Sequence, residues 1–121
     1  MYLILFVLHN TGALDDVLNA WEEAGVSGIT ILPSTGLARM RQKGALRDDL
    51  PLIPSLSDLL EHVEHMNRTL FTIVDGDEMV DRVVAATEQV VGELDLPDTG
   101  ILTVLPVARA YGLHRRNGNA Q

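Results

Sequence analysis

The sequence predicts an α+β domain, a ferredoxin-like βαββαβ sandwich with an extended loop and a short extra helix between strands 2 and 3. Two observations support this fold class. Each half of the chain reads as a strand, an amphipathic helix and a strand, and a long stretch without hydrophobic periodicity separates the halves. The expected strands cover residues 2–9, 26–33, 69–74 and 101–105, and the long helices cover 13–24 and 77–93.

The first half opens with a near-continuous apolar run over 2–9, which is typical of a strand buried in the middle of a sheet. Asn10 or Thr11 can cap the helix that follows. Gly25 suits the left-handed residue that ends a helix, and the β-branched run after it predicts the strand over 26–33. The single tryptophan lies on the apolar face of the helix and is expected in the core. That face comprises Leu14, Val17, Leu18 and Trp21.

The loop expected over 35–54 contains glycines, prolines and cations but no sustained period. At about 20 residues it is long for a connection inside a compact domain, and such loops are usually functional or disordered. Ser55 or Ser57 can cap a short helix over 55–66. The sequence leaves open whether this helix belongs to the body or to the loop.

The second half repeats the pattern of the first. The turn at 75–77 is expected to cap the second long helix, and Gly92 and Pro97 are expected to close it. Pro106 is expected to end the last strand, and the tail over 113–121 is expected to fray.

The predicted sheet has an uncovered face. Both helices would pack on one side of an antiparallel sheet, while the first, second and fourth strands are apolar nearly throughout. The side without helices would therefore carry apolar side chains as well. Such a surface predicts an oligomer interface, most simply between the sheets of several copies.

Composition narrows the class of protein. The 121 residues are expected to form a single domain over 1–121, and a net charge of −8 argues against general nucleic-acid binding. The absence of cysteine excludes disulfides and thiol chemistry. No apolar run approaches the roughly 20 residues that span a bilayer, and the apolar start lacks the basic region of a signal peptide. We expect a cytoplasmic protein.

The basic residues are concentrated in two segments. Seven of the nine lie either in the loop or near the C-terminus: Arg39, Arg41, Lys43 and Arg47, then Arg109, Arg115 and Arg116. An acidic body with two basic segments can focus a small anion. Gly36 also lets the backbone turn sharply or approach a ligand closely just before Arg39. The end of the second strand is therefore a candidate anion site.

Two other clusters have competing interpretations. His62 and His65, with Glu61 nearby, have a spacing that can bind a divalent metal, although solvent-exposed histidines that titrate with pH are the favoured interpretation. A carboxylate cluster could suit magnesium, but capping of the helix explains it better; it comprises Asp75, Asp77, Glu78 and Asp81. No arrangement of Ser, His and Asp predicts a nucleophile, so an enzyme is not expected.

Six short motifs occur along the chain, each once, in an order that is typical of a known family. Leu-Asp-x-Val lies at 14–17, Gly-Val-x-Gly-Ile-Thr at 25–30, Gly-Leu-Ala-Arg at 36–39, Gln-Lys-Gly at 42–44, Thr-Gly at 99–100 and Val-Leu-Pro-Val at 104–107. In this order and spacing the chain resembles the PII signalling proteins, the nitrogen regulatory protein P-II superfamily, and their PII-like relatives. The resemblance extends from residue 1 to about 116, and the chain looks like a divergent member of this superfamily.

The resemblance implies a ferredoxin-like homotrimer that transduces signals by binding a small anionic effector, with an adenine nucleotide as the candidate, in clefts between subunits. The base of the long loop and the C-terminal arginines of a neighbouring subunit would meet there on phosphates. Loop 36–54 would then control a membrane transporter or an enzyme. The ligand-binding residues implied are Thr35, Gly36, Leu37, Arg39, Thr99, Gly100, Arg115 and Arg116.

The chain also departs from the family pattern. Only Thr99-Gly100 remains of the glycine-rich turn that follows the second long helix, and Met40 replaces the glutamine after the loop arginine. Two alternatives therefore stay open. One is a protein-interaction trimer without a ligand. The other is a metal-responsive trimer like the CutA proteins, which would bind copper or zinc through His62 and His65.

Overall fold

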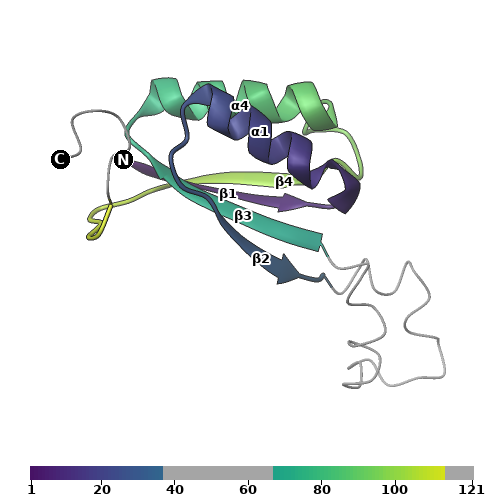
Figure 1. The fold of residues 1–121 in the computed structure, drawn as a ribbon, viewed down its shortest axis with the longest axis horizontal. Coiled ribbons are helices and arrows are strands. Elements are labelled where there is room, and N and C mark those ends of the chain that lie inside the picture. The colour runs from purple at the N-terminus through teal and green to yellow at the C-terminus, as the bar shows by residue number, and fades with distance from the viewer. Residues whose placement is uncertain (37–66, 114–121) are drawn as a thin grey trace, which may run out of the picture.

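The computed structural model describes residues 1–36 and 67–113 (Figure 1). Its elements in chain order are β1 (Tyr2–Leu8), the 3-10 helix η1 (Thr11–Ala13), α1 (Leu14–Ala24), β2 (Thr30–Ser34), β3 (Asn67–Val74), α4 (Asp77–Val91) and β4 (Ile101–Pro106). The predicted loop beyond Gly36, the predicted helix over 55–66 and the tail beyond Leu113 lie outside the described residues. Within the described ranges, no helix is long and apolar enough to cross a membrane.

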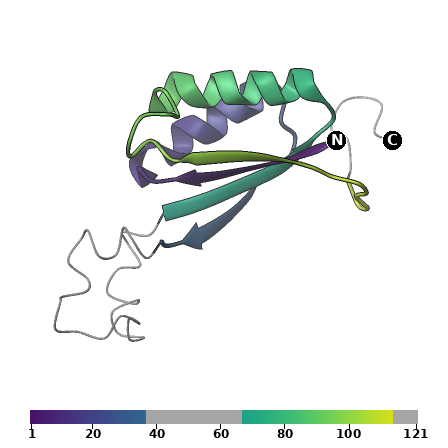
Figure 2. The same cartoon turned by 180° about the vertical axis from the view of Figure 1, so that it is seen from behind.

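The four strands form one antiparallel sheet in the order β2-β3-β1-β4. β1 is central and pairs with β3 on one side and with β4 on the other. Figures 1 and 2 show α1 and α4 side by side over one face of the sheet. Residues 1–36 and 67–113 therefore form an α+β structure with a four-stranded antiparallel sheet and two α-helices, compatible with the predicted ferredoxin-like fold.

The core lies between the sheet and the two helices. Every second residue of β1 faces it, and Ile4, Phe6 and Leu8 are fully buried. Trp21 is fully buried beside Phe6, with ring centroids 6.4 Å apart. Its indole N–H donates to the hydroxyl of Thr87 on α4 at 2.8 Å, which satisfies a buried donor. The prediction that the tryptophan belongs to the core is confirmed.

Both ends of the first helical segment follow the sequence prediction. The Asn10 side chain caps η1, which leads into α1, by accepting a hydrogen bond from the Gly12 N–H at 3.1 Å. Gly25 ends α1 with φ +112°, a conformation that side-chain-bearing residues rarely adopt. These local signals place α1 to within one residue of the predicted start.

β2 starts four residues later than predicted, so the predicted strand over 26–33 was wrong at its beginning. Val26 is buried, and its N–H donates to the Trp21 carbonyl at 3.0 Å. The Gly28 carbonyl accepts a hydrogen bond from the Thr72 hydroxyl at 2.6 Å rather than from a strand partner. Residues 26–29 therefore connect the helix layer to the sheet, and the β-branched Val26 packs in the core instead of beginning a strand.

Two other expectations about element ends are corrected. Pro106 is part of β4 rather than its terminator. The Val107 N–H donates to the Met1 carbonyl and so points toward β1. The backbone nitrogen of the preceding residue, Pro106, therefore points away from the sheet. Proline is tolerated there because no N–H is needed on the outer side of an edge strand. The N-cap of α4 is Gly76, and no side chain makes a capping bond there. α4 ends at Val91, two residues before the predicted end, with Gly92 as its C-cap.

The face of the sheet away from the helices, the open face, is built from the alternate strand positions. The register aligns Leu32, Thr69, Val7 and Ile101 across the four strands, so these four residues share that face. No charged side chain occupies it within the described strands. Its apolar members are Leu3, Leu5, Val7, Leu32, Phe71, Ile73, Ile101 and Leu105. This arrangement agrees with the apolar uncovered face expected from the sequence.

Candidate functional site

The described ranges contain half of the predicted ligand-binding residues. Thr35 and Gly36 follow β2, and Thr99 and Gly100 precede β4. The other four, Leu37, Arg39, Arg115 and Arg116, lie outside the described residues, as do the metal candidates His62 and His65. The predicted site is therefore described only at two places, residues 35–36 after β2 and residues 99–100 before β4.

The end of β2 carries polar side chains beside the candidate residues. Ser34 pairs with Asn67 at the beginning of β3, and the Ser34 and Thr69 hydroxyls are hydrogen-bonded at 2.8 Å. A guanidinium N–H of Arg68 donates to the Asn67 carbonyl at 3.3 Å, which holds a cation at this end of the sheet. Thr35 therefore follows the end of β2, where Ser34 is hydrogen-bonded to Thr69 and Arg68 carries a positive charge.

Gly36 is not required by the geometry of the chain itself. A Cβ built on it would meet no atom of residues 1–36 or 67–113 within 4 Å. It is also absent from the glycines with positive φ. The left-handed or crowded backbone that would demand glycine is therefore not found at this position, although the open space around it is compatible with a ligand close to the backbone.

Thr99 and Gly100 have roles within their own turn. The Thr99 hydroxyl donates to the Leu96 carbonyl at 2.9 Å and lies 3.3 Å from the Leu94 carbonyl. Gly100 has φ +128°, and a Cβ there would lie only 2.5 Å from the Val7 carbonyl oxygen. Hydrogen bonds within the turn account for Thr99, and close packing against β1 accounts for Gly100. The role of both residues toward a ligand stays a prediction.

The two structured ends of the site lie far apart within one chain. Both are at the same end of the sheet, because Leu32, Val7 and Ile101 share one row of the register. They are on opposite edges, however, since β3 and β1 lie between β2 and β4. Three strand spacings amount to about 14 Å. A single small anion cannot contact both pairs of residues in one chain.

A groove that sequence reasoning missed lies at the other end of β2. This β2 groove has a volume of about 410 Å³, and its wall includes the exposed Thr30 and the aromatic ring of Phe71. The C-terminal segment 107–113 reaches it, so Arg115 and Arg116 follow in sequence just beyond the groove. The full lining is Ser27, Gly28, Ile29, Thr30, Phe71, Thr72, Ile73, Gly112 and Leu113.

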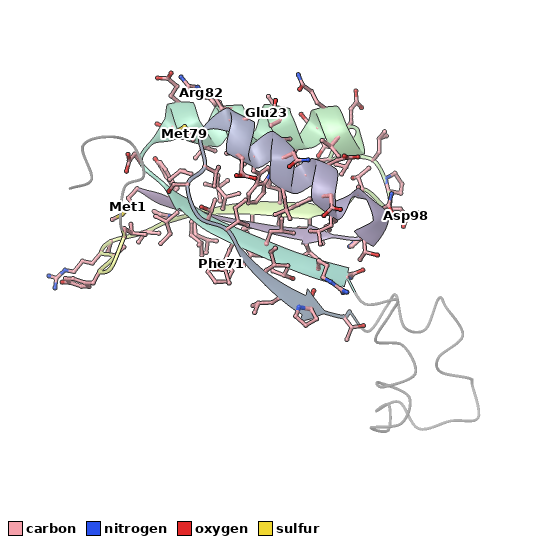
Figure 3. All side chains as sticks on the ribbon, viewed as in Figure 1. Met1, Glu23, Phe71, Met79, Arg82 and Asp98 are labelled. Atoms are coloured by element: carbon pink, nitrogen blue, oxygen red, sulfur yellow. The ribbon has the colours of Figure 1, made fainter. Side chains whose placement is uncertain are left out.

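Figure 1 shows the C-terminal segment, in yellow, at the end of the molecule opposite to the end of β2. Figure 3 shows Phe71 on the side of the sheet away from the helices. The glycines at 28 and 112 were the available sequence signal, but Gly28 was assigned to a strand and Gly112 was placed after the last strand, next to the predicted frayed tail. Only the tertiary fold brings the two segments together.

The carboxylates around the start of α4 have structural roles. Among the described residues, no group of three or more His, Cys, Asp or Glu side chains is placed to hold a metal ion. Asp77 and Glu78 lie in the first turn of α4, where the helix dipole favours negative charge. Asp77 also raises the pKa of the Tyr2 hydroxyl through a hydrogen bond and its charge.

No family model matches the chain, and no curated protein matches it either. The function is therefore argued from the residues, the grooves and the open face of the sheet.

Proposed function

We propose that this chain is a PII-like regulatory protein that forms a homotrimer and senses a small anionic effector, an adenine nucleotide, in clefts between its copies. Loop 36–54 then controls a partner, a membrane transporter or an enzyme. The observation that carries the proposal is the separation of the candidate residues. The loop base and the C-terminal segment lie at opposite ends of β2 in one chain, and a second copy would bring the loop base of one chain beside the C-terminal segment of another.

The strand order supports the fold that the proposal needs. The described elements follow one another as strand, helix, strand, strand, helix and strand, with β1 and β3 central in the sheet. This arrangement is compatible with a ferredoxin-like split βαβ. We propose that fold, with the long loop and the additional helix over 55–66 inserted between β2 and β3.

The open face supports assembly into a homo-oligomer. It carries eight large apolar side chains and no charged one within the described strands, and Leu32, Ile101 and Leu105 are 42–59% exposed in the isolated chain. Leaving so much contiguous apolar surface in water is unfavourable by about 25 cal/mol for each Å² that could be buried. A second and a third copy supply an equally apolar surface to cover it.

The β2 groove supports a nucleotide as the effector. Its volume of about 410 Å³ lies within the range of ligand pockets. Phe71 and Ile73 offer an apolar wall for a planar base, and the Thr30 side chain adds a hydroxyl. Arg115 and Arg116 of the same copy and Arg39 of a neighbouring copy would then pair with phosphates.

The test is a thermal-shift titration of the intact protein with ATP, ADP, AMP and inorganic phosphate. A ligand at one hundred times its Kd stabilises the folded state by about 2.7 kcal/mol. We expect a nucleotide to raise the melting temperature, and Arg39→Ala to weaken its binding without dissociating the oligomer. Arg82→Ala is the matched control, because Arg82 pairs with Glu78 on the helix side. Equal affinity of the Arg39→Ala variant and the wild type would refute the site.

A ligand-free interaction trimer is the second candidate. The packing roles of Thr99 and Gly100 favour it, because these residues need no ligand to explain them. It predicts no thermal shift with any nucleotide but the same oligomer. A metal-responsive trimer like the CutA proteins would instead respond to copper or zinc, and would lose that response in the His62→Ala and His65→Ala variants.

A further inference from the structure

The last strand, β4, forms one edge of the sheet, and β2 forms the other (Figures 1 and 2). An edge strand has backbone N–H and C=O groups on its outer side that no neighbouring strand binds. Within residues 1–36 and 67–113, no strand lies beyond β4. Its outer edge therefore offers backbone groups to another chain.

The register shows which residues of β4 carry these outward groups. The Val107 N–H donates to the Met1 carbonyl, so the alternate positions 101, 103 and 105 also bond to β1. The residues between them, Leu102 and Val104, point their N–H and C=O groups outward. Pro106 is outward as well, but it has no N–H. Leu102 and Val104 therefore each supply one donor and one acceptor along the outer edge.

The two edges of the sheet differ in how well they can pair. Carried across β1 and β3, the same alternation makes Ile31 and Pro33 the outward residues of β2. A proline therefore interrupts that short edge, and only Ile31 offers both groups. Proline and charged side chains are the usual protections of an edge strand. β4 has no charged residue, and its proline comes only at its end.

The side chains of β4 are exposed on both faces of the sheet. Ile101 and Leu105 on the open face are 59% and 42% exposed. Val104 is 36% exposed on the helix side, where it shares a register position with the buried Ile4. A copy that packs on the open face alone leaves Val104 in water. A strand added to the edge contacts side chains on both faces at once.

We propose that β4 pairs antiparallel with β4 of a second copy, about a two-fold axis at Thr103. In this register Leu102 lies opposite Val104 of the second copy, and each donates its N–H to the carbonyl of the other. Ile101 lies beside Leu105 of the second copy on the open face. The edge is self-complementary, because every outward N–H of the two strands meets a carbonyl.

This pairing is weaker than the contact between open faces. A six-residue strand and its copy form a contact smaller than the roughly 1,200 Å² of stable interfaces. We expect a Kd of about 100 µM, so the paired form is a minor species at micromolar concentration. The proposal goes beyond the effector site and does not depend on it, since the backbone edge and the open face are different surfaces.

The experiment is backbone hydrogen exchange of the full chain, labelled at about 10 µM and at about 1 mM and read after quenching. We expect the amides of Leu102 and Val104 to exchange at least about threefold more slowly at the higher concentration, because about four-fifths of the chains are then paired. The Ile31 amide should exchange equally at both concentrations. Unchanged exchange at Leu102 and Val104, or equal slowing at Ile31, would overturn the proposal.

Variants on the two edges give a second readout, the mean mass by sedimentation equilibrium over the same concentrations. The wild-type mass should rise with concentration. Val104→Pro removes an outward N–H without touching the bonds to β1, so its mass should stay constant, as should that of Val104→Lys if the proline variant does not fold. Ile31→Pro is the matched control and should associate like the wild type.

Two results of the mass measurement contradict the pairing at β4. One is a folded Val104→Pro or Val104→Lys variant that associates like the wild type, and the other is a loss of association in a folded Ile31→Pro variant. Each mass is compared with the mass of the same variant at low concentration. The test therefore does not require that species to be a trimer or to bind a nucleotide, and it separates a failure here from a failure of the proposed function.

Discussion

The two faces of the sheet have similar side chains and different surroundings. Ile4, Phe6 and Leu70 face the helices and are fully buried, whereas Leu32 and Ile101 on the open face are 48% and 59% exposed. The two faces therefore do not differ in the hydrophobicity of their side chains. They differ because α1 and α4 cover only one of them. The fold needs only one apolar face to make its core, so the second is available for assembly.

The largest expected effect comes from a pair of neighbouring residues on opposite faces. Phe6→Ala removes a buried ring beside Trp21 and should lower the free energy of unfolding by about 3–5 kcal/mol at any protein concentration. Leu5→Ala on the open face should instead lower stability in a concentration-dependent way, since it weakens contacts between copies. Denaturant unfolding at several protein concentrations measures both, and the same dependence in the two variants would remove the distinction between the faces.

Two glycines give the next largest difference. Gly100→Ala should destabilise the chain by more than about 2 kcal/mol, because φ is +128° and the new Cβ would meet the Val7 carbonyl at 2.5 Å. Gly36→Ala should change stability by less than about 0.5 kcal/mol, because its φ is not positive and no atom of the described residues would lie within 4 Å of the new Cβ. Thermal unfolding of both variants without ligand is the measurement. A large loss in Gly36→Ala would show that this glycine has a structural role.

These glycines also show how far the sequence could predict the structure. The ends of α1 were predictable because the signals at Asn10 and Gly25 act within a few residues. The start of β2 was not, because Val26 is β-branched for packing in the core and only the tertiary fold reveals that. The sequence suggested a ligand role for Gly100. Its structural role could not be foreseen, because the contact that a Cβ would make with the Val7 carbonyl depends on strands far apart in the sequence.

The candidate site was predictable only in part for a similar reason. The cations and the loop base are local in sequence, but the β2 groove combines residues near 28, 71 and 112. No periodicity or motif links three such distant segments. The separation of the candidate residues on opposite edges of the sheet follows from the strand order, which only the structure provides.

A smaller effect is expected from removing the buried hydrogen bond between Trp21 on α1 and Thr87 on α4. Thr87→Val keeps the side-chain shape but leaves the Trp21 N–H buried without an acceptor. It should cost about 1–3 kcal/mol of unfolding free energy. Thr87→Ser retains the hydroxyl and should recover most of the loss. Equal stability of the valine and serine variants would mean that the hydrogen bond contributes little.

The smallest effect concerns the solvent side of the helices. Glu78 and Arg82 form an ion pair at 2.6 Å, but their side chains are 81% and 55% exposed. Glu78→Gln should therefore lower stability by no more than about 0.5 kcal/mol, and less at high salt. Thermal unfolding at low and high ionic strength checks it, and a salt-independent loss above 1 kcal/mol would contradict this account of the outer surface.

The native mass of the full chain in solution, by light scattering or native mass spectrometry, tests the central claim most directly. The account predicts a homotrimer, and it predicts that Val7→Glu, which places a carboxylate in the middle strand of the open face, yields a folded monomer. Gln89→Glu, at an exposed position on α4 away from the open face, should remain a trimer. A wild-type chain that stays monomeric at micromolar concentration would contradict both the interface and the effector site built on it.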